Sequence, residues 1–213
     1  NIFIIGNSYA DDLLSLFYNN NKLNSDYYFY TAVADNVGSN YQINCFLSFL
    51  KDNKKICEKN FFSFFQTQYS KSDYIIFHEM FANPNTYLSS NFDKTIQLIK
   101  KDKKKFMVFL DDLRGADILD IYIHRKGDLP NLKDLNDLEK ELFTKVTNFE
   151  KKDMERLKNK FIENNIKFLT RSELFCDYKK KKCPLIRNNN KLYSDDGHLT
   201  DNGAEYFSIK GKL

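Results

Sequence analysis

Short apolar runs recur along the chain, and the segments between them carry apolar residues at helical spacing. Three of the runs, IFII, YIIF and FMVFL, are nearly continuous in apolar residues. Such continuity is typical of strands that are covered on both faces, because both sets of alternating side chains are then buried. The runs with strand character are Ile2–Ile5, Tyr27–Ala34, Tyr74–Phe77, Phe106–Leu110 and Ile166–Leu169.

The intervening segments predict helices. The clearest are Ala10–Tyr18, Asp93–Ile99 and Leu138–Asn164, and Thr200 can cap a last short helix through Glu205–Phe207. Strands that alternate with helices form βαβ units. We therefore predict an α/β fold, a three-layer α/β/α sandwich with a five-stranded, mostly parallel sheet. No internal repeat and no Pro/Gly/Ser linker divides residues 1–213, so we expect a single domain.

Composition and charge exclude several classes of protein. Hydrophobic residues make up 42% and charged residues 29%, which is a soluble globular composition. The net charge of +4 arises from 33 basic and 29 acidic residues, a balance too even to predict nucleic acid or an anionic membrane as a partner. The lysine runs Lys100–Lys105 and Lys179–Lys182 are typical of solvated loops. No apolar run approaches the length of about 20 residues that a membrane span requires.

The four cysteines do not have the spacing of zinc knuckles. Their even number, and the short separations within Cys45/Cys57 and Cys176/Cys183, favour two local disulfides. Three pairings are formally possible. The alternative is a set of buried thiols in a reducing compartment.

A strand–turn–helix segment near the start holds a candidate nucleophile. In IFIIGNSYADDLL, the first strand ends at Gly6 and a helix begins near Ala10, which places Ser8 in the turn. Such a turn exposes a side chain at the carboxyl edge of the sheet, and the first free N–H groups of the helix can stabilise an oxyanion there. Gly6 permits the tight geometry. The alternative is that Ser8 only caps the helix.

A second segment, LYSDDGHLTDNGAEYF, offers an acid–base partner for that serine. Asp195 and His198 are three residues apart, directly before the capped helix. In a turn this spacing lets the carboxylate reach Nδ1–H of the imidazole, which leaves Nε2 to take a proton from a serine. Among the three histidines, His78, His124 and His198, only His198 has a carboxylate placed in this way. The alternative is a surface turn in which His198 is incidental.

Other polar residues end predicted strands or lie in loops. His78 ends the third strand, and we expect a hydrogen-bonded structural histidine there, with pocket lining as the alternative. His124 lies in or near the longest irregular region, Gly115–Leu135, and should be exposed. That region is either an insertion near the site or a surface loop. Asp111 and Asp112 should cap a turn or contact a polar substrate, and without a third ligand no metal site is predicted.

A serine after the first strand and a D-x-x-H before the last helix resemble the arrangement of the SGNH (GDSL-like) hydrolase superfamily. GNSYA is similar to the GDSHA-type first block of one branch, the SGNH domain at the carboxyl end of integral-membrane O-acyltransferases. The segment FCDYKKKKCPLI…KLYSDDGHLTDNGA is similar to that branch's tail, with two cysteines, an aromatic residue, D-x-x-H-L-S/T and Gly-Ala. The resemblance covers the two ends of the chain, and it implies an SGNH/flavodoxin-like fold.

The resemblance also implies the roles of the site residues. Ser8 matches the nucleophile, His198 the base, and Asp195 the residue that orients the base. The oxyanion hole would combine the backbone N–H of Ser8 with Gly38 in DNVGSN and Asn83 in YIIFHEMFANPN. The family's GxND block is absent from the region of Asn83.

The activity implied is serine-dependent O-acyl transfer to, or hydrolysis from, a carbohydrate-type hydroxyl, with acetyl as the expected group and an acyl-enzyme on Ser8. The resemblance implies an acylated carbohydrate or similar small molecule as substrate, and an N-terminal transmembrane acyltransferase domain in a longer parent protein. The domain would then lie outside the cytoplasm (lumenal, periplasmic or extracellular) and be tethered to a membrane, which two disulfides would suit.

Three alternatives stay open. A plain esterase would use water as the acceptor. The missing GxND block favours a second alternative, a catalytically weak SGNH-fold binding or accessory domain of a membrane acyltransferase. A flavodoxin-like flavin or nucleotide binder would need a phosphate-cradling loop, but Gly6 is the only glycine in the first βα turn, so no cofactor is predicted.

Overall fold

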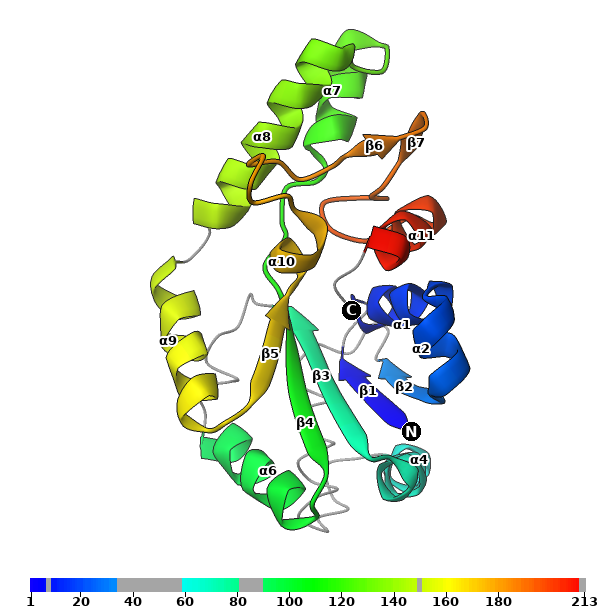
Figure 1. Cartoon of the computed structure of the whole chain (residues 1–213), viewed down its shortest axis with the longest axis vertical. Helices are drawn as coiled ribbons and strands as arrows, with labels where there is room; N and C mark the ends of the chain where they lie inside the picture. The colour runs from blue at the N-terminus through cyan, green and yellow to red at the C-terminus, as the bar shows by residue number, and fades with distance from the viewer. Residues whose placement is uncertain (7–8, 34–58, 81–89, 149–150, 211–213) are drawn as a thin grey trace.

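A computed structural model describes residues 1–6, 9–33, 59–80, 90–148 and 151–210 (Figure 1). Its centre is a five-stranded sheet in the order β2-β1-β3-β4-β5, with every neighbouring pair parallel. The α/β fold predicted from the apolar runs is therefore confirmed. The strands are β1 (Ile2–Gly6), β2 (Phe29–Val33), β3 (Tyr74–Met80), β4 (Lys105–Asp111) and β5 (Lys167–Thr170).

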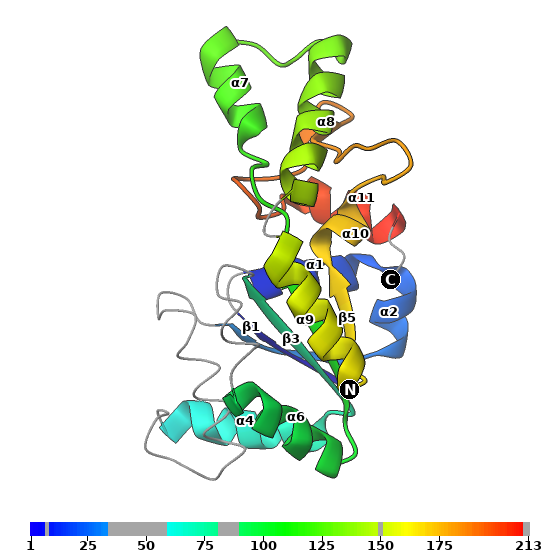
Figure 2. The ribbon, with the colours of Figure 1, turned by 90° about the vertical axis from the view of Figure 1, so that its left-hand side faces the viewer.

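Helices cover both faces of the sheet (Figure 2). One layer consists of α1 (Tyr9–Asn19), α2 (Asn21–Asp26) and α11 (Asp201–Lys210). The opposite layer consists of α4 (Lys59–Lys71), α6 (Ser90–Lys101) and α9 (Lys151–Glu163). This arrangement is the predicted three-layer sandwich.

Side chains of β1 alternate between the two layers. Ile2 and Ile4 belong to the apolar cluster that contains α1, whereas Phe3 and Ile5 belong to the cluster that contains α4. All four are at most 7% exposed. Because successive residues of a strand point to opposite faces, a strand between two helical layers must be apolar at every position. Burial of each such side chain stabilises the fold by about 1.5–3 kcal/mol relative to exposure.

Gly6 ends β1 where that strand lies against His78 of β3. A Cβ atom at Gly6 would lie 1.8 Å from the carbonyl oxygen of His78, a backbone atom that can move only with the sheet. We expect Gly6→Ala to destabilise the fold by about 3 kcal/mol, the upper end of overpacking costs, as measured by urea unfolding. Gly127→Ala is the control: its φ is 82° but no atom lies within 4 Å, so it should cost about 1–2 kcal/mol. A smaller loss at Gly6 than at Gly127 would contradict the prediction.

The region Gly115–Leu135 was predicted to be irregular, and this prediction is wrong. It contains α7 (Ile118–Lys126) and the start of α8 (Leu132–Asn148). The two helices project together beyond the sheet, joined at their outer ends (Figures 1 and 2). In ILDIYIHRK the isoleucines do not mark one helical face, so the sequence carries no amphipathic period there.

The helix predicted over Leu138–Asn164 is two helices, α8 and α9. Leu142 and Val146 of α8 pack into the cluster on the α1 side of the sheet. Leu157 and Phe161 of α9 pack into the cluster on the other side. A single straight helix cannot pack against both faces of the sheet, so the segment forms two helices.

The carboxyl-terminal part also contains α10 (Arg171–Phe175) and a small antiparallel pair, β6 (Ile186–Arg187) with β7 (Asn190–Lys191). Cys176 and Cys183 form the local disulfide expected between them. Cys45 and Cys57 lie outside the described residues. No helix within the described ranges is long and apolar enough to cross a bilayer.

Candidate functional site

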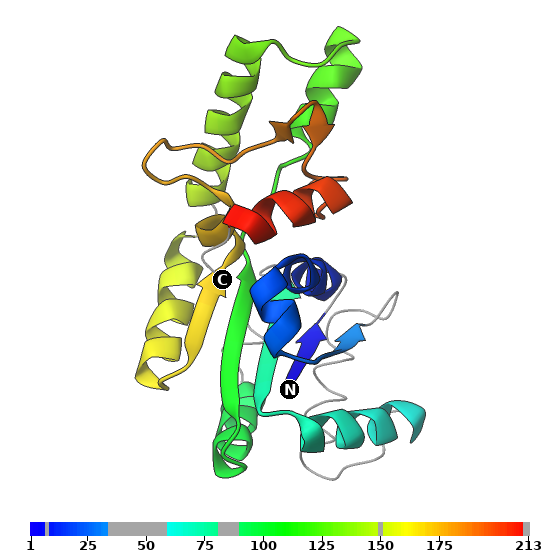
Figure 3. The same ribbon diagram turned by 45° about the vertical axis from the view of Figure 1, so that its right-hand side comes forward.

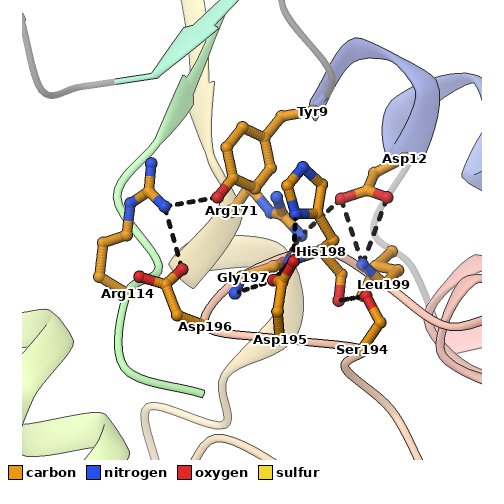
Figure 4. Close-up of polar contacts among 10 residues, drawn as sticks. All are labelled: Tyr9, Asp12, Arg114, Arg171, Ser194, Asp195, Asp196, Gly197, His198 and Leu199. Atoms are coloured by element: carbon orange, nitrogen blue, oxygen red, sulfur yellow. Dashed lines mark hydrogen bonds and ion pairs between the residues drawn. The ribbon is translucent and has the colours of Figure 1, made fainter. Parts of the chain in front are cut away.

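The turn before α11 is ordered by the carboxylate of Asp195 (Figure 4). Its Oδ2 lies 2.7 Å from Nδ1 of His198. Its Oδ1 accepts the backbone N–H groups of Gly197 at 2.9 Å and of His198 at 2.8 Å. The N–H of Ser194 donates to the His198 carbonyl at 2.8 Å and closes the turn. A single carboxylate therefore sets both the backbone path and the plane of the imidazole.

The charge state of Asp195 follows from these contacts. Burial is the largest single influence on its pKa and would raise it, but the hydrogen bonds from Gly197 and His198 together hold the pKa of Asp195 below its ordinary value. The carboxylate is therefore ionised at neutral pH and keeps the proton of the imidazole on Nδ1, so that Nε2 carries the basic lone pair. The His198 side chain is 30% exposed, so the imidazole is partly accessible to solvent.

Tyr9, the first residue of α1, packs flat against His198. The two ring centres are 4.1 Å apart and the planes differ by 2°. Arg114 donates to the Tyr9 hydroxyl and pairs with Asp196 at 3.0 Å. The guanidinium carbons of Arg114 and Arg171 lie 4.8 and 5.0 Å from the Tyr9 ring centre. A cation over an aromatic face is attracted to the ring, so the two arginines help to hold the buried Tyr9 ring in place. The ring then provides a fixed surface for the imidazole.

A buried ion pair between Arg171 and Asp12 supports the same turn. Arg171 is fully buried and lies 3.2 Å from Asp12 Oδ2, and it donates to the Gly197 carbonyl at 2.6 Å. Both oxygens of Asp12 lie 3.2 Å from the N–H of Leu199. Arg171 therefore holds the backbone directly before His198, and Asp12 holds the backbone directly after it. Burial raises the pKa of Asp12, although Arg171 and the Leu199 N–H act in the opposite direction.

Sequence reasoning did not identify Asp12, Arg171, Tyr9 or Arg114 as site residues. The acidic pair after Ala10 and the arginine directly after the last strand were visible, but neither has a partner nearby in sequence. The contact from Asp12 to Leu199 spans 187 positions, and the contact from Arg114 to Tyr9 spans 105. No local sequence pattern indicates a contact between residues that are so far apart in the chain.

Asp112 follows β4 and contacts the first turn of α10. It accepts the backbone N–H of Ser172 at 2.8 Å and also the Ser172 hydroxyl. Burial raises its pKa, against the effect of these hydrogen bonds. Asp112 therefore supports the first turn of α10, whose N-cap is Thr170, and does not cap a turn as expected. The side chain of Asp111 lies outside the described part.

His78 is fully buried beneath the site and packs edge-on against Phe109, with ring centres 4.7 Å apart. Neither ring nitrogen meets strict hydrogen-bond geometry with a group in the described part of the chain. A looser hydrogen bond with the Tyr9 backbone acts to raise the pKa of His78, so the histidine is held by this contact and by aromatic packing. Burial, and secondarily Arg171, lowers its pKa well below 6.5, which keeps it neutral. His124 is exposed, as predicted.

The other predicted site residues, Ser8, Gly38 and Asn83, lie outside the described residues. Ser8 directly precedes Tyr9, the residue that stacks on His198. Within the ranges that the structure describes, no group of three or more His, Cys, Asp or Glu side chains could hold a metal ion.

Comparison with known proteins agrees with this architecture. Residues 1–208 match the family model described as SGNH domain (fused to AT3 domains). No curated protein matches the sequence. The crystal structure of an acetyl xylan esterase, AlAXEase, is similar with a TM-score of 0.50 at 12% identity, covering 99% of this chain and 97% of that chain. At that identity the likeness shows the fold alone. Because the family model matches nearly the whole chain, this chain belongs to the family of SGNH domains fused to AT3 domains.

Proposed function

We propose that this domain is a serine esterase or O-acyltransferase in which Ser8 is the nucleophile, His198 its base and Asp195 the residue that orients the base. The observation that carries the proposal is the 2.7 Å contact between Asp195 Oδ2 and His198 Nδ1. An ionised carboxylate at Nδ1 directs Nε2 to accept a proton, which is the role of the imidazole in serine hydrolases. Tyr9 supports the assignment, because it contacts the imidazole and is the covalent neighbour of Ser8.

The proposed reaction has two half-reactions, and in each of them Nε2 of His198 takes up a proton and then releases one. In the first, Nε2 takes the proton of Ser8 Oγ as Oγ attacks the acyl carbonyl, and Asp195 stabilises the imidazolium that forms. The tetrahedral intermediate expels the alcohol oxygen, which takes the proton back from Nε2. In the second, water or an acceptor hydroxyl gives its proton to Nε2 and attacks the acyl-enzyme. The second tetrahedral intermediate then releases the acid or the new ester by breaking its bond to Ser8 Oγ, which takes the proton back from Nε2.

The backbone N–H of Ser8, with Gly38 and Asn83, is the proposed oxyanion hole for both steps. Donors aimed at a developing oxyanion are worth about 3–4 kcal/mol each in comparable enzymes. The region of Asn83 lacks a GxND sequence, so its contribution is the part of the site for which the sequence offers least support.

The proposed substrate is an O-acylated, and specifically acetylated, carbohydrate. Two findings support this class: the family is described by fusion to AT3 domains, and the fold is shared with an enzyme named as an acetyl xylan esterase. We further propose that residues 1–213 form one catalytic domain of a longer protein with an N-terminal transmembrane acyltransferase domain. The Cys176–Cys183 disulfide fits a position outside the cytoplasm.

Labelling with a fluorophosphonate probe tests the nucleophile. We expect the wild-type domain to be labelled and both Ser8→Ala and His198→Ala to lose labelling, because the probe reacts with an activated serine. Ser194→Ala is the matched control, since Ser194 is an exposed serine of the same turn and should not affect labelling. Persistent labelling of Ser8→Ala would overturn the assignment. Absence of labelling in every form would favour an accessory binding domain. Release of acetate with and without an added sugar acceptor then separates hydrolysis from transfer.

A further inference from the structure

A lysine-rich hairpin closed by a disulfide stands near α11 (Figure 3). Cys176 and Cys183 are covalently joined, and Asp177 and Lys182 exchange backbone hydrogen bonds of 2.7 and 3.1 Å. The four consecutive lysines Lys179–Lys182 therefore lie on a doubly restrained turn. Restraint of the backbone reduces the conformational entropy that ordering these side chains around a ligand would cost.

This hairpin lines a cavity of about 490 Å³, a size typical of ligand sites. The lining also includes Arg187 from β6 and Tyr206 from α11. The Arg187 guanidinium lies 5.4 Å from the Tyr206 ring centre, and its Nε donates to the Tyr206 hydroxyl at 3.0 Å. The side chain of Arg187 is held further by Glu139, whose carboxylate is 3.0 Å away. This part of the lining is therefore an ordered cationic and aromatic surface.

The charge of the lining is mostly positive. Asp177 is its one acidic residue, and its carboxylate lies 3.8 Å from Lys180. Lys179 and Lys182 also line the cavity, and Lys179 shares the single carboxylate of Asp177 with Lys180. The lining thus holds four cationic side chains against one carboxylate, together with the half-exposed ring of Tyr178.

We propose that this cavity binds an acidic glycan segment, in which a sugar carries a carboxylate or a phosphate. Lys179 and Lys182 would bind the anionic group, while Tyr178 and Tyr206 would cover the apolar face of the sugar ring. A nucleic acid is a poorer match, because proteins that bind it present an extended basic surface, whereas this chain balances 33 basic against 29 acidic residues. None of Asp195, Gly197 and His198 lines the cavity, so binding there does not require the proposed reaction.

Affinity electrophoresis of the oxidised wild-type domain tests this site. We expect polygalacturonate in the gel to retard the domain, and its fully methyl-esterified form to retard it far less, because esterification removes the charge and keeps the sugar backbone. Phosphomannan compared with neutral mannan distinguishes phosphate from carboxylate as the preferred group. Ser8→Ala should bind as tightly as wild type, so a failure of the catalytic proposal would leave this result unchanged.

Charge reversal locates the binding surface. We expect Lys179→Glu/Lys182→Glu to weaken polygalacturonate binding by about tenfold or more. Lys94→Glu/Lys101→Glu makes the same charge change on exposed lysines of α6, at the other end of the molecule (Figure 1), and should bind nearly as wild type. Equal losses in the two double variants would overturn the proposal in favour of non-specific attraction. Equal binding of the methyl-esterified polymer, or tighter binding of single-stranded DNA, would also overturn it.

Discussion

His198→Ala should lower kcat/KM for hydrolysis of an aryl acetate by about 10⁴-fold or more, measured under conditions where the variant remains folded. Loss of the base removes the proton acceptor for Ser8 and the donor for the leaving group in one change, and triad members act as a unit. What remains should be the smaller contribution of the oxyanion hole and of substrate binding. A loss of less than about tenfold would contradict the assignment of His198 as the base.

Asp195→Asn and Asp196→Asn form a matched pair that tests the same site. An amide at position 195 can still accept the backbone N–H groups of Gly197 and His198, but its NH₂ group would face Nδ1 and favour the wrong tautomer. Asp196 is half-exposed and pairs with Arg114, away from the imidazole nitrogens. Asp195→Asn should therefore cost much more activity than Asp196→Asn. Similar losses would mean that the turn needs charge in general and that no triad operates.

Arg171→Met should destabilise the fold by about 3–5 kcal/mol at neutral pH, measured by urea unfolding. Arg171 is fully buried, and its removal leaves the carboxylate of Asp12 buried without its counter-charge. The double variant Asp12→Asn/Arg171→Met removes both charges and should lose clearly less stability than Arg171→Met. An equal loss in the two would show that packing and the Gly197 contact matter more than the charge.

The destabilisation caused by Arg171→Met should depend on pH in a defined direction. The pKa of Asp12 in the folded protein already lies above its unfolded value of 3.8 because of burial, and Arg171 acts to lower it. Without Arg171 the folded-state pKa rises further. The folded variant then takes up a proton that the unfolded chain does not, so its stability increases as pH falls through that raised pKa. The difference from wild type should be greatest near neutral pH and shrink on acidification, and a constant difference would contradict this account.

The core strands could be predicted closely because burial on both faces requires a nearly continuous run of apolar residues, which is visible in the sequence. β1, β3 and β4 lie between two helical layers, so almost every position is apolar. The apolar run that predicted the third strand stops at Phe77, and His78 was expected to end the strand, yet β3 continues to Met80. Parallel pairing with β4 supplies hydrogen bonds to those residues whatever their side chains are.

The sequence by itself determined the layered α/β architecture, the local disulfide at Cys176 and the contact of Asp195 with His198. Each of these depends on residues close together in the chain, whose spacing limits the geometry that they can adopt. Only the tertiary structure decided that Tyr9 stacks on His198, that Asp12 and Arg171 brace the turn around it, and that Lys179 and Lys182 line one cavity with Arg187 and Tyr206. Those contacts join segments far apart in sequence, and it is the packing of α1, α10 and α11 against the sheet edge that brings them together.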